Sequence, residues 1–283
     1  MKQQTVIGID LGGTNIRAGL VRDGRIDKLV STLVPADGQV QHVLDELFFL
    51  TDKIIGVEVK GIGIGVPGLV DPDSGVVFDV INIPAWQEVP LQQLMEKRYH
   101  LPVMINNDAN CFALGEYCFG KGRDQKNMVG LTIGTGLGAG IILNGQLYSG
   151  MNGAAGEFGM IPYLDKYLEY YASGQFFQNC YGVDGGAVYQ QALNGEEKAI
   201  RQYQEFGKHL GNAIKTILYA LDIECIILGG SVRHAYPYFS GAMWEQVKTL
   251  AFSRTVKQLK IEISELENGA ILGAAGLALE SKK

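Results

Sequence analysis

The chain has 283 residues, which suffices for two domains because a domain usually takes about 100–200 residues. Hydrophobic residues make up 47% and charged residues 19%, a balance that supports a sizeable core and excludes an intrinsically disordered chain. The formal net charge of -6 excludes the strongly basic surface expected of a protein that binds nucleic acid or anionic membranes.

Three predicted strands open the chain, and helices alternate with strands after them. The dipeptide Asp23-Gly24 is typical of a tight hairpin turn between the second and third strands. Apolar residues spaced like one face of a helix then predict a helix over Val40–Ile55. In chain order, the elements predicted for this half are Thr5–Asp10, Ile16–Val21, Arg25–Leu33, Val40–Ile55, Val59–Val66, Leu91–Tyr99, Val103–Asn106 and Ala109–Phe119.

The second half is predicted to repeat this order in a weaker form. Its first two strands are joined by the glycine-rich turn Gly134–Gly138, and Asn144-Gly145 turns the chain into a third strand. A long helix is expected over Glu196–Ala220, because apolar residues recur there at helical spacing. The other predicted elements are strands over Met128–Ile133, Ala139–Leu143, Glu224–Gly229 and Lys260–Ser264, a helix before Ser253, and a closing helix from about Ala270.

The similar order of elements in the two halves is a weak internal repeat. We therefore predict an α/β fold of two domains related by duplication, with a cleft between them. The N-terminal domain is expected over residues 1–119 and the C-terminal domain over residues 120–269. The closing helix, at about residues 270–283, is expected to pack back on the N-terminal domain.

Cysteines, histidines and apolar runs are too scattered to indicate a disulfide framework, a metal cluster or a membrane span. The four cysteines contain no C-x-x-C pair, and the four histidines lie far apart. Asp10 interrupts the first apolar run, so the N-terminus does not resemble a secretory signal peptide. A stretch of about 18 apolar residues, as a transmembrane helix requires, is not present. We therefore expect a cytoplasmic protein without nucleic-acid or membrane partners.

Two glycine-rich turns, each between two predicted strands, are candidate phosphate-binding loops. In the first, Gly12 and Gly13 would let backbone N–H groups approach an anion, and Thr14 would add a hydroxyl donor. The second is Gly134–Gly138. A plain glycine hairpin is the structural alternative for either turn. Asp10, at the end of the first strand, is a candidate to hold a hydrated Mg²⁺.

Partial matches to the dinucleotide-binding pattern G-x-G-x-x-G/A occur at Gly63–Gly68 and Gly134–Ala139. That pattern requires a helix directly after the glycines. A loop follows the first match and a predicted strand follows the second, so both matches fail, and no G-x-x-x-x-G-K-[ST] is present. Two glycine turns in two repeated halves instead fit a polyphosphate held from opposite sides of a cleft.

The segment Asn106–Asn110 (NNDAN) places a carboxylate among amides at the end of a predicted strand. Asp108 is there a candidate general base for a hydroxyl group, although capping of the following helix explains it as well. Glu157 and Glu169, flanked by glycine and aromatic residues, are candidate ligands for vicinal hydroxyls, with a solvated helix-end carboxylate as the alternative for each. The turn Leu228–Ser231 would let an adenosine ring lie on its backbone, or is a plain strand-to-helix turn.

Taken together, these segments resemble the ROK family (repressors, open reading frames and kinases). The resemblance covers nearly the whole chain and implies the actin/hexokinase-type (ribonuclease H-like) fold, with two α/β domains around a nucleotide- and sugar-binding cleft. The family includes glucokinases, fructokinases, allokinases and N-acetylhexosamine kinases, and also repressors with an N-terminal helix-turn-helix. Because this chain starts directly at the first predicted strand, we expect a kinase. The segments that carry the resemblance are DLGGTNIR, GVPGLVD, NIPAWQEVPL, NNDANCFALGE, TIGTGLGAGI, GAAGEFGMIP, LEYYASG and IILGGSV.

The resemblance implies ATP-dependent phosphorylation of a hexose or hexose derivative, as in glucokinases. Asp108 would be the catalytic base, and Asp10 would assist Mg²⁺ through water. We expect ATP, Mg²⁺ and a small-molecule sugar as ligands, and a homodimer or another homo-oligomer as the assembly. The implied sugar-binding residues are Gly68, Asn107, Asp108, Glu157 and Glu169. The implied ATP-binding residues are Asp10, Gly12, Gly13, Thr14, Gly134, Thr135, Gly136, Gly229 and Gly230.

One segment departs from the family pattern. ROK proteins usually carry G-E-x-G-H and then C-x-C-G-x-x-G-C-x-E, whose Cys and His residues serve a structural zinc. Here Met160 takes the histidine position, and the cysteine segment is reduced to YLDKYLEYYASG, in which Glu169 remains. We therefore expect no zinc, Met160 as an apolar gap-filler, and a loop held by packing. The residues expected to pack together are Tyr163, Leu164, Tyr167, Leu168, Tyr170, Tyr171, Phe176 and Phe177.

Two other functional classes stay open. A sugar-binding regulator without turnover is compatible with the altered zinc segment, and sugar-dependent release of ADP would exclude it. An actin-like filament or chaperone ATPase would share the glycine turns but would not need Asn107 and Asp108 together with Glu157 and Glu169. Hydrolysis of ATP that is indifferent to added sugars would favour this last class.

Overall fold

The computed structural model describes residues 4–35, 39–80 and 83–280, and it divides into two compact units. The first unit consists of residues 1–126, 140–155 and 265–283, and the second of residues 127–139 and 156–264. Among the described residues, no helix is long and apolar enough to cross a membrane. Three predicted segments lie partly outside the described residues. The parts concerned are Met1–Gln3 of the N-terminal domain, Asn82 of the segment NIPAWQEVPL, and Ser281–Lys283 of the closing helix.

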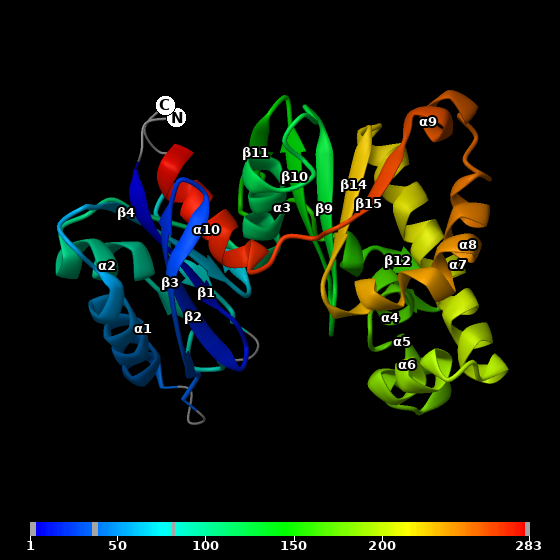
Figure 1. Cartoon of the computed structure of the whole chain (residues 1–283), viewed down its shortest axis with the longest axis horizontal. Coiled ribbons are helices and arrows are strands. Elements are labelled where there is room, and N and C mark those ends of the chain that lie inside the picture. The colour runs from blue at the N-terminus through cyan, green and yellow to red at the C-terminus, as the bar shows by residue number, and fades with distance from the viewer. Residues whose placement is uncertain (1–3, 36–38, 81–82, 281–283) are drawn as a thin grey trace. The chain divides into compact units, whose positions relative to one another are not determined.

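Five strands form the mixed sheet of the first unit (Figure 1), namely β1 (Thr5–Leu11), β2 (Asn15–Arg22), β3 (Arg25–Leu33), β4 (Val59–Val66) and β8 (Val103–Asn107). Their order is β3-β2-β1-β4-β8. The first three strands are antiparallel neighbours, whereas β4 and β8 run parallel to β1. Asp23 and Gly24 both have positive φ in the turn between β2 and β3, which confirms the predicted hairpin.

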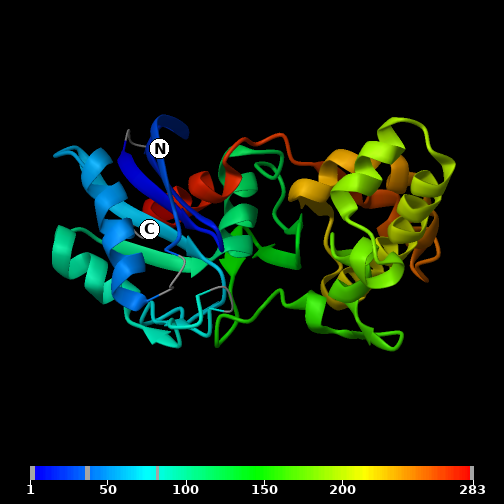
Figure 2. The same cartoon turned by 90° about the horizontal axis from the view of Figure 1, so that it is seen from below.

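Helices from separate parts of the chain cover this sheet, namely α1 (Val40–Ile54), α2 (Leu91–Tyr99), α3 (Asp108–Phe119) and α10 (Gly269–Glu280). Successive side chains of a strand point to opposite faces, so Ile9 of β1 packs with α1 and α2, whereas Val6 packs with α10. α10 lies close to the backbone of the sheet, because a Cβ at Gly63 would be 1.7 Å from the carbonyl oxygen of Ala274. Both cartoon views show α10, from the end of the chain, beside the first strands (Figures 1 and 2).

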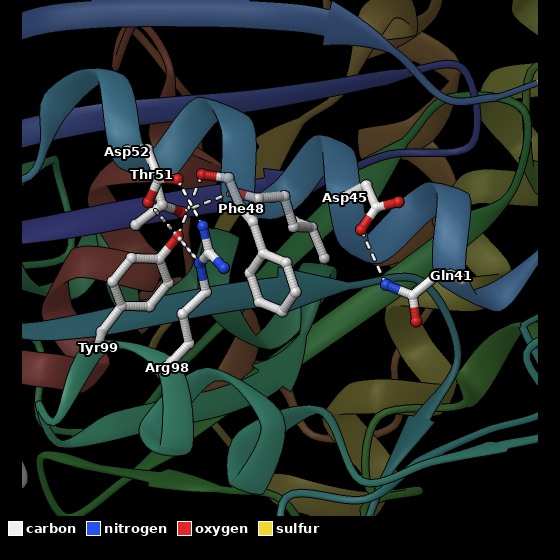
Figure 3. Close-up of polar contacts among 8 residues, drawn as sticks. Gln41, Asp45, Phe48, Thr51, Asp52, Arg98 and Tyr99 are labelled. Atoms are coloured by element: carbon white, nitrogen blue, oxygen red, sulfur yellow. Dashed lines mark hydrogen bonds and ion pairs between the residues drawn. The ribbon is translucent and has the colours of Figure 1, made fainter.

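Polar contacts join α1 to the end of α2 (Figure 3). The guanidinium of Arg98 lies 2.7 Å from one carboxylate oxygen of Asp52, and the hydroxyl of Tyr99 donates to the other oxygen at 2.8 Å. Burial of Tyr99 and then its hydrogen bond to Asp52 raise the pKa of Tyr99 to about 12. The hydroxyl therefore stays a donor at neutral pH, and the two helices are fixed against each other.

A second mixed sheet contains β9 (Met128–Ile133), β10 (Leu137–Leu143), β11 (Gln146–Tyr148), β14 (Cys225–Gly229) and β15 (Lys260–Ile263). Its order is β11-β10-β9-β14-β15, with β14 parallel to both of its neighbours and β10 antiparallel to β11. The second unit holds two long helices that pack on each other, α7 (Glu197–Leu221) and α8 (Tyr236–Val247). They approach closely at Gly207, where a Cβ would lie 2.4 Å from the carbonyl oxygen of Phe239.

The long elements predicted from the sequence are therefore present in both halves, and the predicted α/β class is confirmed. The structure adds that both sheets are mixed. The prediction missed short elements within the loops. After Gly68, three two-residue strands form a small antiparallel sheet, β5 (Leu69–Val70), β6 (Val77–Phe78) and β7 (Glu88–Val89). The other short elements are η1 (Phe158–Met160), β12 (Pro162–Tyr163), β13 (Lys166–Tyr167), α4 (Leu168–Ala172), α5 (Phe176–Tyr181), α6 (Gly185–Leu193), η2 (Ser231–Ala235) and α9 (Ser253–Gln258).

Candidate functional site

The carboxyl ends of parallel strands bring three predicted polar residues to one edge of the first unit's sheet. Asp10 of β1 pairs in register with Gly65 of β4, and Gly65 pairs with Asn106 of β8. Asn107 ends β8, and Asp108 follows directly as the first residue of α3. Ligands of open α/β sheets bind outside the carboxyl ends of the strands, so this edge is a candidate site.

Asn107, not Asp108, is the N-cap of α3. Its side-chain oxygen accepts hydrogen bonds from the N–H groups of Ala109 at 2.8 Å and Asn110 at 3.4 Å. One carboxylate oxygen of Asp108 also accepts from the N–H of Ala109, at 2.8 Å. The N-cap position is therefore filled by Asn107, and Asp108 adds a second acceptor and a negative charge in the first turn of α3.

The side-chain amides around Asp108 form hydrogen bonds with one another and with the neighbouring backbone. The side-chain oxygen of Asn106 accepts from the N–H of Asn107 and from the amide of Asn110, both at 2.8 Å, while its amide donates to the Ser149 hydroxyl at 3.1 Å. The Asn107 amide donates to the carbonyl oxygen of Gly68 at 3.1 Å. The start of α3 is thereby tied to the turn that carries Gly68.

Two glycines favour this arrangement, because a side chain would be crowded at one and strained at the other. At Gly65, a Cβ would lie 3.1 Å from the sulfur of Cys111 and 3.7 Å from the Cα of Asp108, so the absence of a side chain lets the start of α3 approach β4. Gly68 has φ of +113°, which side-chain-bearing residues rarely adopt. The positions of Asp108 and Asn107 therefore depend on glycines of a neighbouring strand and turn.

Asp10 is paired with a cation through one oxygen. Its Oδ2 lies 2.5 Å from Nη2 of Arg17, and the same guanidinium donates to the Asn268 side chain at 3.4 Å. The Asp10 side chain is only 11% exposed. Since the ion pair engages Oδ2, Oδ1 is the atom that would hold a water of a hydrated Mg²⁺. This donor set fits an ion bound through water, which Mg²⁺ favours.

Each glycine turn is closed by a hydrogen bond from its first glycine, three residues ahead in the first turn and two in the second, and the next two N–H groups remain as donors. The N–H of Gly12 donates to the carbonyl oxygen of Asn15 at 2.9 Å, and the N–H of Gly134 donates to that of Gly136 at 3.0 Å. Successive N–H donors in a turn suit an anion such as a phosphate. Among the described residues, no hydrogen-bond partner is found for the N–H groups of Gly13, Thr14, Thr135 and Gly136.

Glu157 and Glu169 lie together beside the second glycine turn. Oε2 of Glu169 accepts from the N–H of Leu137 at 2.8 Å, and a Cβ at Gly136 would lie 2.6 Å from the same oxygen. The Glu157 side chain reaches solvent, but partial desolvation and then the negative charge of Glu169 raise the pKa of Glu157. The structure thus brings two predicted sugar ligands and the predicted phosphate loop into one cluster.

A pocket of about 500 Å³ lies within the second unit, beside the same turn. It includes Gly134 and Thr135 and continues to Ser231. Gly230, directly before Ser231, has φ of +78°, and a Cβ there would lie 2.2 Å from the carbonyl oxygen of Ile133. The remaining wall offers apolar surface to a flat ring, through Phe177, Tyr189, Tyr203, Val232 and Ala235. Of the lining residues, the sequence analysis had singled out Gly134, Thr135 and Ser231 for the nucleotide.

Aromatic residues of the segment from β12 to α5 pack around His209 of α7. The ring centroids of Tyr163, Tyr171 and Phe176 lie 5.8 Å, 4.9 Å and 5.6 Å from that of His209. Nδ1 of His209 is 3.1 Å from the Tyr163 hydroxyl, which also accepts from the Asn212 amide at 3.0 Å. Burial lowers the pKa of His209. In the part of the chain that the structure describes, no three His, Cys, Asp or Glu residues are grouped to hold a metal ion.

Two expectations for this segment are wrong. Met160 is 53% exposed and does not fill a gap in the core, because it ends the short helix η1 at the surface. Leu164 is 69% exposed because it occupies the turn between β12 and β13, with φ of +54°. Leu168, Phe176 and Phe177 are buried as expected. His209 was missed, because a single histidine on an amphipathic helix gives no signal in the sequence.

Comparison with known proteins supports a single family. The model of the family described as "ROK family" matches residues 6–281. A glucokinase of Thermotoga maritima is 29% identical, with 99% of each chain covered. An N-acetyl-D-glucosamine kinase of Yersinia pseudotuberculosis is 31% identical, with 97% of this chain and 99% of the kinase covered. A putative xylose repressor of Caldicellulosiruptor is 28% identical, with 97% of this chain and 78% of the repressor covered.

A solved structure has the same fold. The ROK family glucokinase of Streptomyces griseus, in complex with glucose and AMPPNP, superimposes with a TM-score of 0.83 at 28% identity. The match covers 98% of this chain and 99% of that glucokinase.

Proposed function

This chain belongs to the ROK family, and on that premise we propose that it transfers the γ-phosphoryl group of ATP to a hydroxyl group of a hexose or hexose derivative. Asp108 is the general base in this proposal. The proposed sugar ligands are Asn107 and Gly68 in the first unit, and Glu157 and Glu169 in the second. The relatives that act on glucose and N-acetyl-D-glucosamine support a hexose as the class of acceptor.

The observation that carries the proposal is the placement of Asp108. Its carboxylate stands at the carboxyl edge of the sheet, at the start of a helix whose cap is supplied by Asn107. A carboxylate at this candidate edge, beside a helix start whose N-cap is another residue, is suited to accept a proton. The network through Asn106 and Asn110 keeps this part of the backbone in place.

The reaction follows from these groups. Asp108 accepts the proton of the sugar hydroxyl as the hydroxyl oxygen attacks the γ-phosphorus in line. The new oxygen–phosphorus bond forms as the bond to the bridging oxygen breaks, and ADP leaves with that electron pair. Positioning and neutralisation of charge supply most of the catalysis in this kind of transfer.

Several features support ATP as the donor. The backbone donors of Thr135 and Gly136 adjoin the pocket of about 500 Å³, whose aromatic lining suits an adenosine. Gly13 and Thr14 offer a second pair of donors in the first unit. Asp10 would hold a hydrated Mg²⁺, which would reduce the negative charge of the phosphates when bound. Backbone amides and the ion explain why an acidic chain needs no basic patch for such a ligand.

Replacement of the base tests the assignment. Asp108→Asn keeps the size and hydrogen-bonding capacity of the side chain but does not accept a proton, so kcat should fall about 10²–10⁴-fold. The matched control is Asp45→Asn on the exposed side of α1, where the carboxylate contacts Gln41 (Figure 3). Both variants should retain the melting temperature of the parent. Sugar phosphorylation by Asp108→Asn at the parent rate would contradict the assignment.

The repressor relatives favour one alternative, a sugar-binding regulator of the same fold. Such a protein would bind a sugar without releasing ADP. Calorimetric titration with hexoses, followed by an assay for ADP under the same conditions, separates the two functions. Saturable sugar binding without turnover would favour the regulator.

A further inference from the structure

The segment after η1 is bonded to both ends of the second glycine turn. Oε2 of Glu169 accepts from the N–H of Leu137 at 2.8 Å, where the turn leads into β10. At the other end, the N–H of Gly174 donates to the carbonyl oxygen of Gly134 at 2.7 Å. The two N–H donors between these anchors belong to Thr135 and Gly136. The conformation of the turn is thus set by a segment that lies more than thirty residues later in the sequence.

Glu169 is itself held firmly. It lies in the first turn of α4, whose Leu168 and Ala172 are 1% and 0% exposed. The N–H of Leu168 donates to the carbonyl oxygen of Ile161 at 3.0 Å. Tyr170 and Asn179 exchange two hydrogen bonds, at 3.3 Å and 3.1 Å, which join α4 to α5. A carboxylate on so fixed a helix can act as a rigid anchor for the turn beside it.

We propose that Glu169 is a positioning residue for the phosphate loop, through its hydrogen bond to Leu137, and that it sets the direction of the Thr135 and Gly136 donors. This inference rests on the proposed function, because it takes the loop to bind the phosphates of ATP. Oε2 is engaged by the loop, so any sugar contact of Glu169 is made through Oε1. One side chain then serves the nucleotide and the sugar.

Electrostatic repulsion and an anchoring role predict opposite effects on the affinity for ATP when Glu169 is replaced. A carboxylate beside a polyphosphate repels it, so removal of the charge should strengthen binding of ATP. An anchoring role predicts weaker binding when the acceptor oxygen is lost, whatever happens to the charge. The two effects can be separated with three substitutions at one position.

The experiment is calorimetric titration with ATP and Mg²⁺ in the absence of sugar. Glu169→Ala removes the acceptor and the charge, and Glu169→Asp keeps the charge but withdraws the oxygens by about one bond length, ~1.5 Å. Both should bind ATP about tenfold more weakly than the parent. Glu169→Gln removes the charge but keeps an acceptor oxygen in place, so its affinity should stay within about threefold of the parent. Glu197→Gln, an exposed carboxylate at the start of α7, controls for the change in net charge.

The outcomes distinguish this inference from the function on which it rests. ATP binding by Glu169→Ala and Glu169→Asp at the parent affinity overturns the anchoring role alone. Equal weakening of ATP binding in all three variants, including Glu169→Gln, also overturns the anchoring role. In that case an acceptor oxygen at this position does not suffice to keep the affinity for ATP. If Glu169→Ala does not fold, the contrast between Glu169→Asp and Glu169→Gln decides. Failure of the parent itself to bind ATP overturns the proposed function together with the inference.

Discussion

The Cys111 thiol is buried close to the candidate base Asp108 and is affected by its charge. Cys111 is completely buried, and its burial, followed by the negative charges of Asp108 and Asp10, raises the pKa of the thiol well above its usual value. This thiol therefore stays neutral and acts as a packing group under the start of α3. Because Gly65 lacks a side chain, Cys111 can lie against β4.

A side chain at Gly136 would be crowded by a neighbouring carboxylate rather than strained by the backbone. The φ of Gly136 is not positive, so a left-handed backbone does not require it. Instead, a Cβ would lie 2.6 Å from Oε2 of Glu169. Gly136→Val should therefore displace the Glu169 carboxylate and lower the affinity for ATP about tenfold or more, with a smaller effect on the affinity for sugar.

Calorimetric titrations with ATP and with sugar measure this difference. Gly241→Ala in α8 is the matched control, because no atom lies within 4 Å of a Cβ at that position. Equal loss of both affinities in Gly136→Val, with a lower melting temperature, would mean that Gly136 is only structural.

At the scale of elements, long regular segments were predictable and short ones were not. The strand β1 is buried throughout, and α7 has one continuous apolar face, so local patterns suffice for both. The two-residue strands β5, β6 and β7 depend on pairing with one another, which no local pattern records. The hydrogen bond between Glu169 and Leu137 joins residues 32 positions apart, so no local sequence pattern predicts it either. Glycine-rich turns and the NNDAN segment marked the candidate site because their residue types are unusual at strand ends.

The segment from β12 to α5 is expected to keep its structure without zinc. Phe176 packs on His209 and Leu168 is buried in the same segment, and burying one large apolar side chain contributes on the order of 1.5–3 kcal/mol. Protein purified without added metal should contain well under one zinc per chain by elemental analysis. Treatment with EDTA, followed by restoration of Mg²⁺, should leave the activity and the melting temperature unchanged. Stoichiometric zinc, or irreversible loss of activity after chelation, would overturn this expectation.

At the scale of the whole molecule, each unit carries a glycine turn closed by the first glycine's N–H. The first unit adds the carboxylates of Asp10 and Asp108, and the second adds those of Glu157 and Glu169 together with the apolar pocket. A protein that only hydrolysed ATP would need the turns and the pocket but no carboxylates for a polyol. The groups of the two units are those that the proposed transfer of a phosphoryl group to a sugar requires.

The central claim is tested most directly by release of ADP from ATP in a coupled assay, with and without sugars. Glucose, mannose, fructose, allose and N-acetylhexosamines should be supplied one at a time with Mg²⁺. We expect at least one of them to raise the rate of ADP release far above the sugar-free rate, with one phosphorylated sugar formed for each ADP. Release of ADP that is the same with every sugar and without sugar, or no release at all, would contradict the account.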